Sequence, residues 1–187
     1  MPSNKYYDKS ASILNKAAYF QTNSKCVFIS YQSDDRTAAA AIANFFLYIG
    51  VDVYFDQYDG DLRLQSQKGD PKVLVDALCR GINNSSHMLV LISPNTLQSR
   101  WVPFEIGFGY DKTKVIALCL KGIPKGGLPE YLRTVSIIRD LYDLNYDIGK
   151  FTGRSADIMK AENLGFSAFN TQHQLNQFMD NLIVDKA

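Results

Sequence analysis

The sequence alternates short apolar runs with amphipathic segments, and this alternation limits the possible folds more than any other feature. Met88–Ile92 and Val115–Leu120 are continuously apolar, as is typical of strands buried on both faces of a parallel sheet. Between such runs, apolar residues recur at helical spacing, as at Ile42, Phe45 and Ile49, which is the pattern of a helix with one buried face. Strands that alternate with helices predict an α/β domain with a parallel sheet and helices on both faces.

The chain offers candidates for every strand and connecting helix of such a domain. The predicted strands are Cys26–Ile29, Val51–Phe55, Met88–Ile92, Val115–Leu120 and Val135–Ile138. The predicted helices are Thr37–Ile49, a helix that begins at Asp70-Pro71 and continues to Ile82, and Trp101–Tyr110. For an open sheet of about five strands we expect the flavodoxin-like order 2-1-3-4-5 in a three-layer α/β fold.

The predicted domain covers residues 25–140, with an extension at each end of the chain. Residues 1–24 carry a helical apolar stripe and are expected to form an N-terminal helical extension. Residues 141–187 are expected to form a C-terminal extension whose closing helix packs on the domain. The apolar stripe of that helix is Leu175, Phe178, Met179, Leu182 and Ile183.

Charge and composition argue against several functions. The chain has 20 Lys and Arg against 19 Asp and Glu, a net charge of +1, which disfavours a broad nucleic-acid-binding face. Cys26, Cys79 and Cys119 lie in apolar segments, so we expect buried thiols in a reducing compartment. His87 and His173 are far apart, which disfavours a histidine-based metal site or nucleophile. No signal-peptide or membrane-spanning run is present, so we expect a soluble cytoplasmic protein without a metal or bound cofactor.

The strand order also predicts where a ligand binds. Ligands of such sheets lie beyond the carboxyl ends of the strands, at the point between strands one and three where the strand order reverses. The loops Ser30–Arg36 and Ser93–Arg100 should therefore form the site. The first loop has no glycine and two acids, which is unsuited to cradling a phosphate with backbone N–H groups. The third strand ends at Ile92-Ser93, without the aspartate of a phosphoryl-accepting regulator.

Trp101 and Glu105 are the residues in the second loop and its helix that most suggest chemistry. They are four residues apart and therefore share a helix face. A purely structural interpretation is that the tryptophan packs the helix against the sheet while the glutamate stays solvated in the first turn. Spacing alone favours that structural interpretation over a functional one.

Four motifs at the predicted strand ends resemble a known family. They are Phe28-Ile-Ser-Tyr31, Phe55-Asp56, Leu91-Ile-Ser-Pro94 and Trp101-Val-x-x-Glu105. In this order they resemble a TIR (Toll/interleukin-1 receptor) domain, and more narrowly the bacterial and animal axon-degeneration TIR enzymes that consume NAD⁺. Among bacterial proteins, the chain is similar to the TIR protein of the Thoeris anti-phage system, which makes an ADP-ribose messenger for a separate effector.

The resemblance implies a function and a set of site residues. Glu105 would be catalytic in cleaving the nicotinamide–ribose bond of NAD⁺, which is the substrate and not a cofactor. Trp101 would stack on a ring or exclude water, and Tyr31 would contact the nucleotide. Weaker substrate-binding assignments fall on Ser30, Asp56 and Ser93. Water as the nucleophile would give ADP-ribose, whereas an internal nucleophile would give a cyclic ADP-ribose. TIR enzymes often require self-association for activity.

One segment departs from the receptor branch of this family. Asp56–Asp70 stands where the BB loop is expected but lacks the Arg-Asp-x-x-Pro-Gly pattern of receptor TIR domains. The departure weakens a receptor-adaptor role more than an enzymatic one. Two alternatives remain open: a non-enzymatic TIR scaffold that acts by homotypic association, and a nucleoside deoxyribosyltransferase, another flavodoxin-like family that uses a glutamate on an N-glycosidic bond.

Overall fold

Five parallel strands form the centre of the protein. A computed structural model describes residues 25–55, 71–124, 126–152 and 173–180. The strands in this part are β1 Cys26–Ser30, β2 Asp52–Tyr54, β3 His87–Ile92, β4 Lys114–Cys119 and β5 Ser136–Ile138. They pair in the order β2-β1-β3-β4-β5, and every pairing is parallel. The predicted flavodoxin-like sheet is therefore confirmed, with strand ends that differ from the predicted ones by a residue or two.

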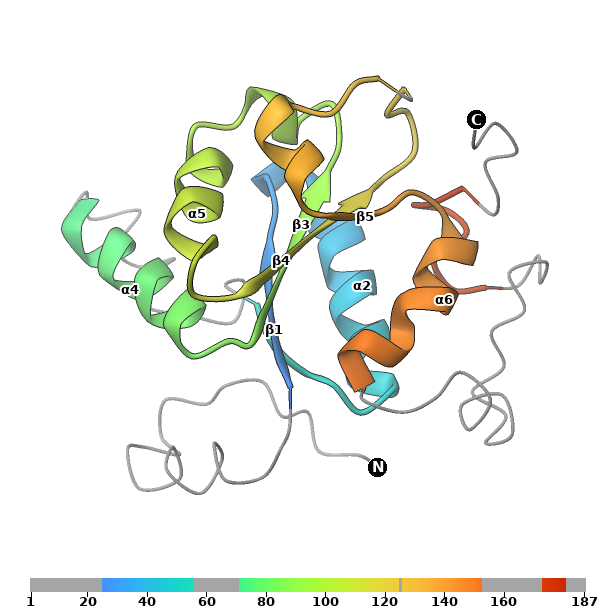
Figure 1. Cartoon of the computed structure of the whole chain (residues 1–187), viewed down its shortest axis with the longest axis horizontal. Helices are drawn as coiled ribbons and strands as arrows, with labels where there is room; N and C mark the ends of the chain where they lie inside the picture. The colour runs from blue at the N-terminus through green and yellow to red at the C-terminus, as the bar shows by residue number, and fades with distance from the viewer. Residues whose placement is uncertain (1–24, 56–70, 125, 153–172, 181–187) are drawn as a thin grey trace.

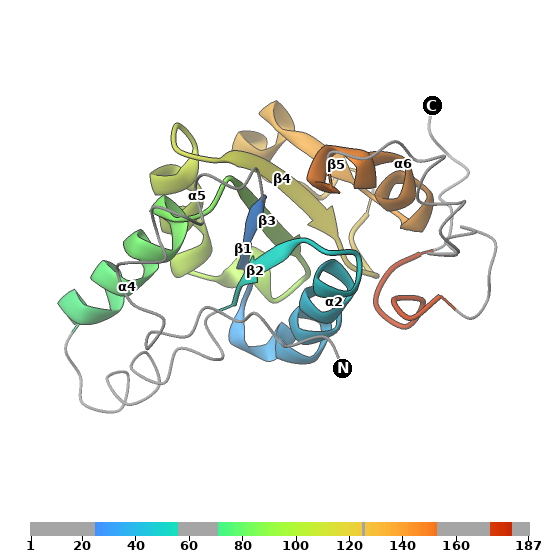
Figure 2. The same cartoon turned by 90° about the horizontal axis from the view of Figure 1, so that it is seen from below.

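Helices cover both faces of the sheet (Figures 1 and 2). The longer helices are α2 Arg36–Tyr48, α4 Pro71–Asn83, α5 Trp101–Gly109 and α6 Leu141–Thr152. Short 3-10 helices are η2 Ser33–Asp35, η4 Thr96–Gln98 and η5 Glu130–Thr134. Figure 1 shows α2 and α6 on one side of the strands and α4 and α5 on the other. This is the predicted three-layer arrangement.

The two layers of helices enclose two separate hydrophobic cores. Along β1, Ile29 packs in the core with α2 and α6, while its neighbour Phe28 packs in the core with α4 and α5. The alternation follows from strand geometry, since successive side chains point to opposite faces of a sheet. Every residue of β3 is buried, which explains its continuous apolar run.

The C-terminal part of the chain differs from the prediction. Helix α6 was not predicted from the sequence. It begins directly after Asp140, whose Oδ1 accepts the Asp143 N–H at 2.8 Å. Residues 173–180 form turns, not the predicted closing helix. Leu175 and Met179 are nevertheless fully buried in the core with α2, so the stripe correctly indicated burial but not backbone conformation. Residues 1–24 and the rest of the stripe lie outside the described residues.

Two helical glycines should respond oppositely to alanine. A Cβ at Gly81 in α4 would lie 2.5 Å from Tyr54 Cε1 and 2.9 Å from Phe28 Cε2. The rings of these two residues stack on each other, with centroids 5.5 Å apart. A Cβ at Gly107 in α5 would meet nothing within 4 Å. We expect Gly81→Ala to lower the free energy of unfolding by about 1–3 kcal/mol through overpacking, and Gly107→Ala to raise it by about 0.5–1 kcal/mol. Urea unfolding of both variants checks this; equal shifts would contradict the packing of α4 on β1 and β2.

His87 makes stability depend on pH. Burial, and then the charges of Lys25 and Lys114, lower the pKa of His87 to about 4. An unfolded histidine titrates near pH 6.5. Between pH 6.5 and pH 4 the unfolded chain therefore binds more protons than the folded chain, so stability that is present above pH 6.5 is lost as the pH falls to 4. We expect His87→Gln to remove about 2 kcal/mol of the difference in unfolding free energy between neutral and mildly acidic solution. Urea unfolding of both proteins at about pH 7.5 and pH 4.5 tests this. An undiminished difference in the variant would refute it.

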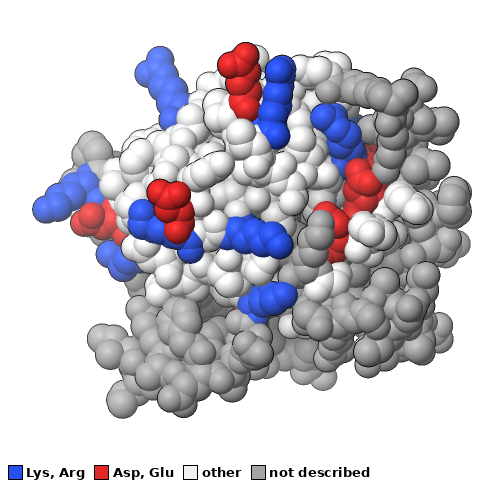
Figure 3. All heavy atoms as spheres, viewed as in Figure 1, with Lys and Arg blue, Asp and Glu red and all other residues white. Residues whose placement is uncertain are grey.

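Charged side chains of the two signs are interspersed on one face of the described surface. On the face in Figure 3, basic side chains stand apart from one another among neutral and acidic residues and form no continuous basic area. This distribution agrees with the near balance of charges in the sequence. Within the described ranges, no helix has both the length and the hydropathy needed to span a membrane.

Candidate functional site

The carboxyl edge of β1 and β3 is where the candidate site residues meet. The two strands are direct neighbours, with Ser30 opposite Val90. From β1 the chain crosses to β2 on one side, while β3 continues the sheet on the other. This is the topological switch point at which ligands of open α/β sheets bind. Ser30 ends β1 and Ser93 directly follows β3, so the two loops predicted from the sequence do lie at this point.

Glu105 is the buried acid of this edge. Glu105 is 6% exposed and Ser30 is 1% exposed, and the Ser30 hydroxyl donates a hydrogen bond to Glu105 Oε2. The start of α5 is fixed because Ser99 Oγ accepts the N–H groups of Trp101 at 3.2 Å and Val102 at 3.3 Å. Strand end and helix start together place the carboxylate beside Ser30.

The surroundings of Trp101 and Glu105 contradict the purely structural interpretation. That interpretation requires a buried tryptophan and a solvated glutamate, yet Trp101 is 42% exposed and Glu105 is 6% exposed. Trp101 lies edge-on to Phe104, with ring centroids 6.1 Å apart. Burying a carboxylate costs free energy even when it is hydrogen-bonded, so its burial at the switch point makes Glu105 a candidate functional residue.

A second set of hydrogen bonds joins the two loops through Asp35, a residue that the sequence analysis did not single out. Ser93 Oγ donates to Asp35 Oδ2, and Asn95 Nδ2 donates to Asp35 Oδ1 at 2.8 Å. Ser93 Oγ also accepts the Asn95 and Thr96 N–H groups at 3.1 and 3.0 Å. The only sequence signal for Asp35 is that it is one of two acids in a loop without glycine.

The remaining predicted residues lie at the borders of this edge. Tyr31 is half-buried and its ring lies 5.2 Å from that of Phe55, where β1 and β2 end. Trp101 is at the exposed start of α5. Asp56 and the segment Asp56–Asp70 lie outside the described residues. The structure thus brings together Ser30 with Glu105 and Ser93 with Asp35.

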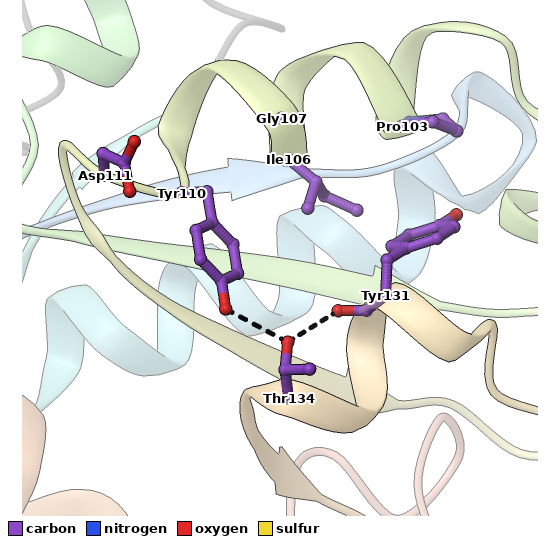
Figure 4. A pocket seen from close by; sticks show the side chains of 7 residues that line it. All are labelled: Pro103, Ile106, Gly107, Tyr110, Asp111, Tyr131 and Thr134. Atoms are coloured by element: carbon purple, nitrogen blue, oxygen red, sulfur yellow. Dashed lines mark hydrogen bonds between the residues drawn. The ribbon is translucent and has the colours of Figure 1, made fainter.

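A cavity of about 500 Å³ lies on another side of α5 and includes none of these residues (Figure 4). Its lining comes from α5, η5 and the turn after α5: Pro103, Ile106, Gly107, Tyr110, Asp111, Tyr131 and Thr134. Tyr110 Oη donates to Thr134 Oγ1 at 3.2 Å, which donates to the Tyr131 carbonyl at 2.9 Å. The cavity is therefore a feature of the α5–η5 junction, separate from the carboxyl edge.

Cys26 and Cys119 are not suited to nucleophilic chemistry. Burial is the main cause that raises the pKa of Cys26 and of Cys119 to about 11. Both thiols are therefore protonated at neutral pH, and it is the thiolate that reacts. Among the residues that the structure describes, no three His, Cys, Asp or Glu side chains gather as a metal site.

The strand order and the helices on both faces of the sheet define a flavodoxin-like α/β protein. The chain belongs to the TIR domain family, because the family model described as "TIR domain" matches residues 27–149. This range includes the four motifs at the strand ends and Glu105.

A solved structure has a similar fold. The chain is similar to the TIR domain of the Toll-related receptor TRR-2 from Hydra magnipapillata, with a TM-score of 0.51 and 17% sequence identity. The match covers 70% of this chain and 97% of the receptor domain. At this identity the likeness shows the fold alone. A comparison with curated protein sequences gave no match.

Proposed function

We propose that this protein cleaves the nicotinamide–ribose bond of NAD⁺, with Glu105 as the catalytic carboxylate. The observation that carries the proposal is the burial of Glu105 beside Ser30 at the switch point of the sheet. Membership of the TIR family supports it, since some TIR domains are NAD⁺-cleaving enzymes while others are scaffolds. A glutamate with a merely structural role would favour an exposed position, whereas Glu105 is buried.

The chemistry suits a site with one buried carboxylate. In NAD⁺ the nicotinamide is a cationic pyridinium, so the electron pair of the breaking C–N bond neutralises it and it leaves without a proton. Most glycosidases need a second carboxyl group because their leaving oxygen must be protonated. Here a single carboxylate can hold the ribose hydroxyls and stabilise the positive charge that develops at C1′. Ser30 would hold the carboxylate in orientation.

The attacking nucleophile determines the product. Attack by water at C1′ gives ADP-ribose and releases one proton. Attack by an adenine nitrogen or a ribose hydroxyl of the same molecule gives a cyclic ADP-ribose. A cyclic or conjugated product would suit a messenger in anti-phage signalling, acting on a separate effector. Within this proposal Tyr31, Asp56, Ser93 and Trp101 contact the substrate, with Trp101 covering the entrance from the start of α5.

A TIR scaffold without turnover is the second candidate, and one observation favours it. Trp101 and Phe104 on α5 are 42% and 39% exposed, and large apolar side chains at a surface often mark a protein-protein contact. TIR domains associate homotypically, so such a contact is compatible with both candidates. A scaffold role does not explain why Glu105 is buried.

Mass spectrometry of the products formed from NAD⁺ tests the proposal. Purified protein is incubated with NAD⁺, with and without phage-infected lysate as activator, and in parallel with deoxynucleosides and a free base. We expect nicotinamide with ADP-ribose or its cyclic isomer. Base exchange on deoxynucleosides without nicotinamide would assign the glutamate to a deoxyribosyltransferase, and homotypic binding with no product in any sample would assign the protein to the scaffolds.

A further inference from the structure

Asp35 is at the start of α2, but its side chain does not cap that helix. It is the N-cap residue of α2, and its side chain makes no capping hydrogen bond. An aspartate at this position usually accepts an N–H of the first turn, which stabilises the helix by about 1 kcal/mol. Here both carboxylate oxygens face the other loop, where they accept from Ser93 and Asn95.

The hydrogen-bond pattern of the other loop requires an acceptor at this place. Ser93 Oγ accepts two backbone N–H groups, those of Asn95 and Thr96. A hydroxyl has two acceptor sites and one proton, so the Ser93 hydroxyl still has its proton to donate. Asp35 Oδ2 lies closer to Ser93 Oγ than the other acceptor, Thr96 Oγ1 at 3.2 Å, and receives it. The Thr96 hydroxyl donates to the Leu91 carbonyl at 2.7 Å and lies farther from Asp35 Oδ2, at 3.4 Å. Both oxygens of Asp35 must therefore accept, which only a carboxylate does.

The contact spans the two loops that border Glu105. One loop follows Ser30, the hydrogen-bond partner of Glu105, and the other leads through Ser99 into α5, which carries Glu105. We propose that Asp35 is a positioning residue that holds these two loops in the arrangement that binds the substrate, an inference that rests on the proposed function. Asp35 acts through Ser93 and Asn95 and need not touch the reacting atoms.

The expected kinetic signature is a higher KM with a nearly unchanged kcat. Without the contact, only a fraction of the molecules hold the loops in the binding arrangement, and apparent affinity falls by that fraction. Saturating NAD⁺ restores the arrangement, so turnover at saturation is maintained. Loss of a hydrogen bond to a charged group corresponds to roughly tenfold or more in such an equilibrium. A residue with a merely structural role would instead lower the active fraction, and thus kcat, at constant KM.

The test compares Asp35→Asn with Asp34→Asn in the full chain. Asp34 is its exposed neighbour in η2, so its substitution removes the same charge from the same turn. Asp35→Asn places an amide N–H against a donor and should raise KM for NAD⁺ about tenfold, while Asp34→Asn leaves KM unchanged. Asn95→Ala, at an exposed position, should reproduce the rise, and the double variant should add little to it. Equal KM values for the Asp35 and Asp34 variants would overturn the proposal.

Amide hydrogen exchange separates this inference from the proposed function. The Asn95 and Thr96 N–H groups are bonded to Ser93 Oγ, so their exchange should accelerate about tenfold in Asp35→Asn and not in Asp34→Asn. This readout requires no turnover. If the wild type releases no nicotinamide, the proposed function fails, while exchange still decides whether Asp35 holds the loops. Unchanged exchange, or faster exchange without a rise in KM in an active enzyme, would refute the positioning role.

Discussion

Replacing Glu105 with glutamine should reduce the rate of nicotinamide release from NAD⁺ by about 10²–10⁴-fold, the range for removing a charged group that acts in the transition state. Glutamine has nearly the same shape and keeps an oxygen that can accept the Ser30 hydroxyl, so the fold should be retained. What is lost is the negative charge that stabilises the developing cation at C1′. KM should change much less than kcat, because the charge acts chiefly in the transition state.

The matched control for this variant is Glu130→Gln. Glu130 is exposed at the start of η5, in the segment between β4 and β5, so the same chemical change there should leave the rate unaltered. Thermal unfolding of both variants checks that each remains folded. If Glu105→Gln releases nicotinamide as fast as the wild type, Glu105 is not the catalytic carboxylate.

Removing the Ser30 hydroxyl should have the next largest effect on activity. A hydrogen bond to a charged group contributes about 1.5–3 kcal/mol, so Ser30→Ala should lower kcat by about 10–100-fold if that bond orients Glu105 in the transition state. The loss acts through Glu105, and Ser30→Ala combined with Glu105→Gln should therefore be little slower than Glu105→Gln alone. Steady-state rates of the four proteins give the coupling directly.

Ser33→Ala provides the comparison within the same loop. Ser33 is exposed at the start of η2, so losing its hydroxyl should alter neither rate nor stability by a measurable amount. If Ser30→Ala retains full activity, its contact with Glu105 is incidental to turnover. If the double variant is slower by the product of the two single effects, Ser30 and Glu105 act independently.

The sheet could be predicted because its strands are marked locally. β3 and β4 are buried along nearly their whole length, so each appears in the sequence as an unbroken apolar run between polar turns. Helix α6 was not predicted, although Leu141, Leu144 and Ile148 have helical spacing. Its start is marked only by Asp140, which caps it. Leu175 and Met179 have helical spacing in the sequence but pack into the core from turns. Their spacing indicated which side chains are buried, not the backbone conformation.

The site could be predicted only in part because its contacts join distant segments. Ser30 and Glu105 are 75 residues apart, and their contact depends on how β1, β3 and α5 pack. Helix α5 is apolar on most sides, so its sequence does not say which side faces the sheet. Packing decides this: a Cβ at Gly109 would lie 2.7 Å from Met88 Cε, so this side of α5 faces β3, and Glu105, four residues earlier, turns inward. Trp101 is on the same side but is the first residue of the helix, and it stays exposed. The Asp35–Asn95 contact likewise has no local pattern.

The most direct test is the release of nicotinamide by the wild-type protein as its concentration is raised, with self-association measured in parallel. We expect nicotinamide to accumulate in proportion to the NAD⁺ consumed, and the rate per molecule to rise as the protein associates. Unchanged NAD⁺ at every concentration, in a folded protein that demonstrably associates, would contradict the claim that the buried Glu105 belongs to an NAD⁺-cleaving site.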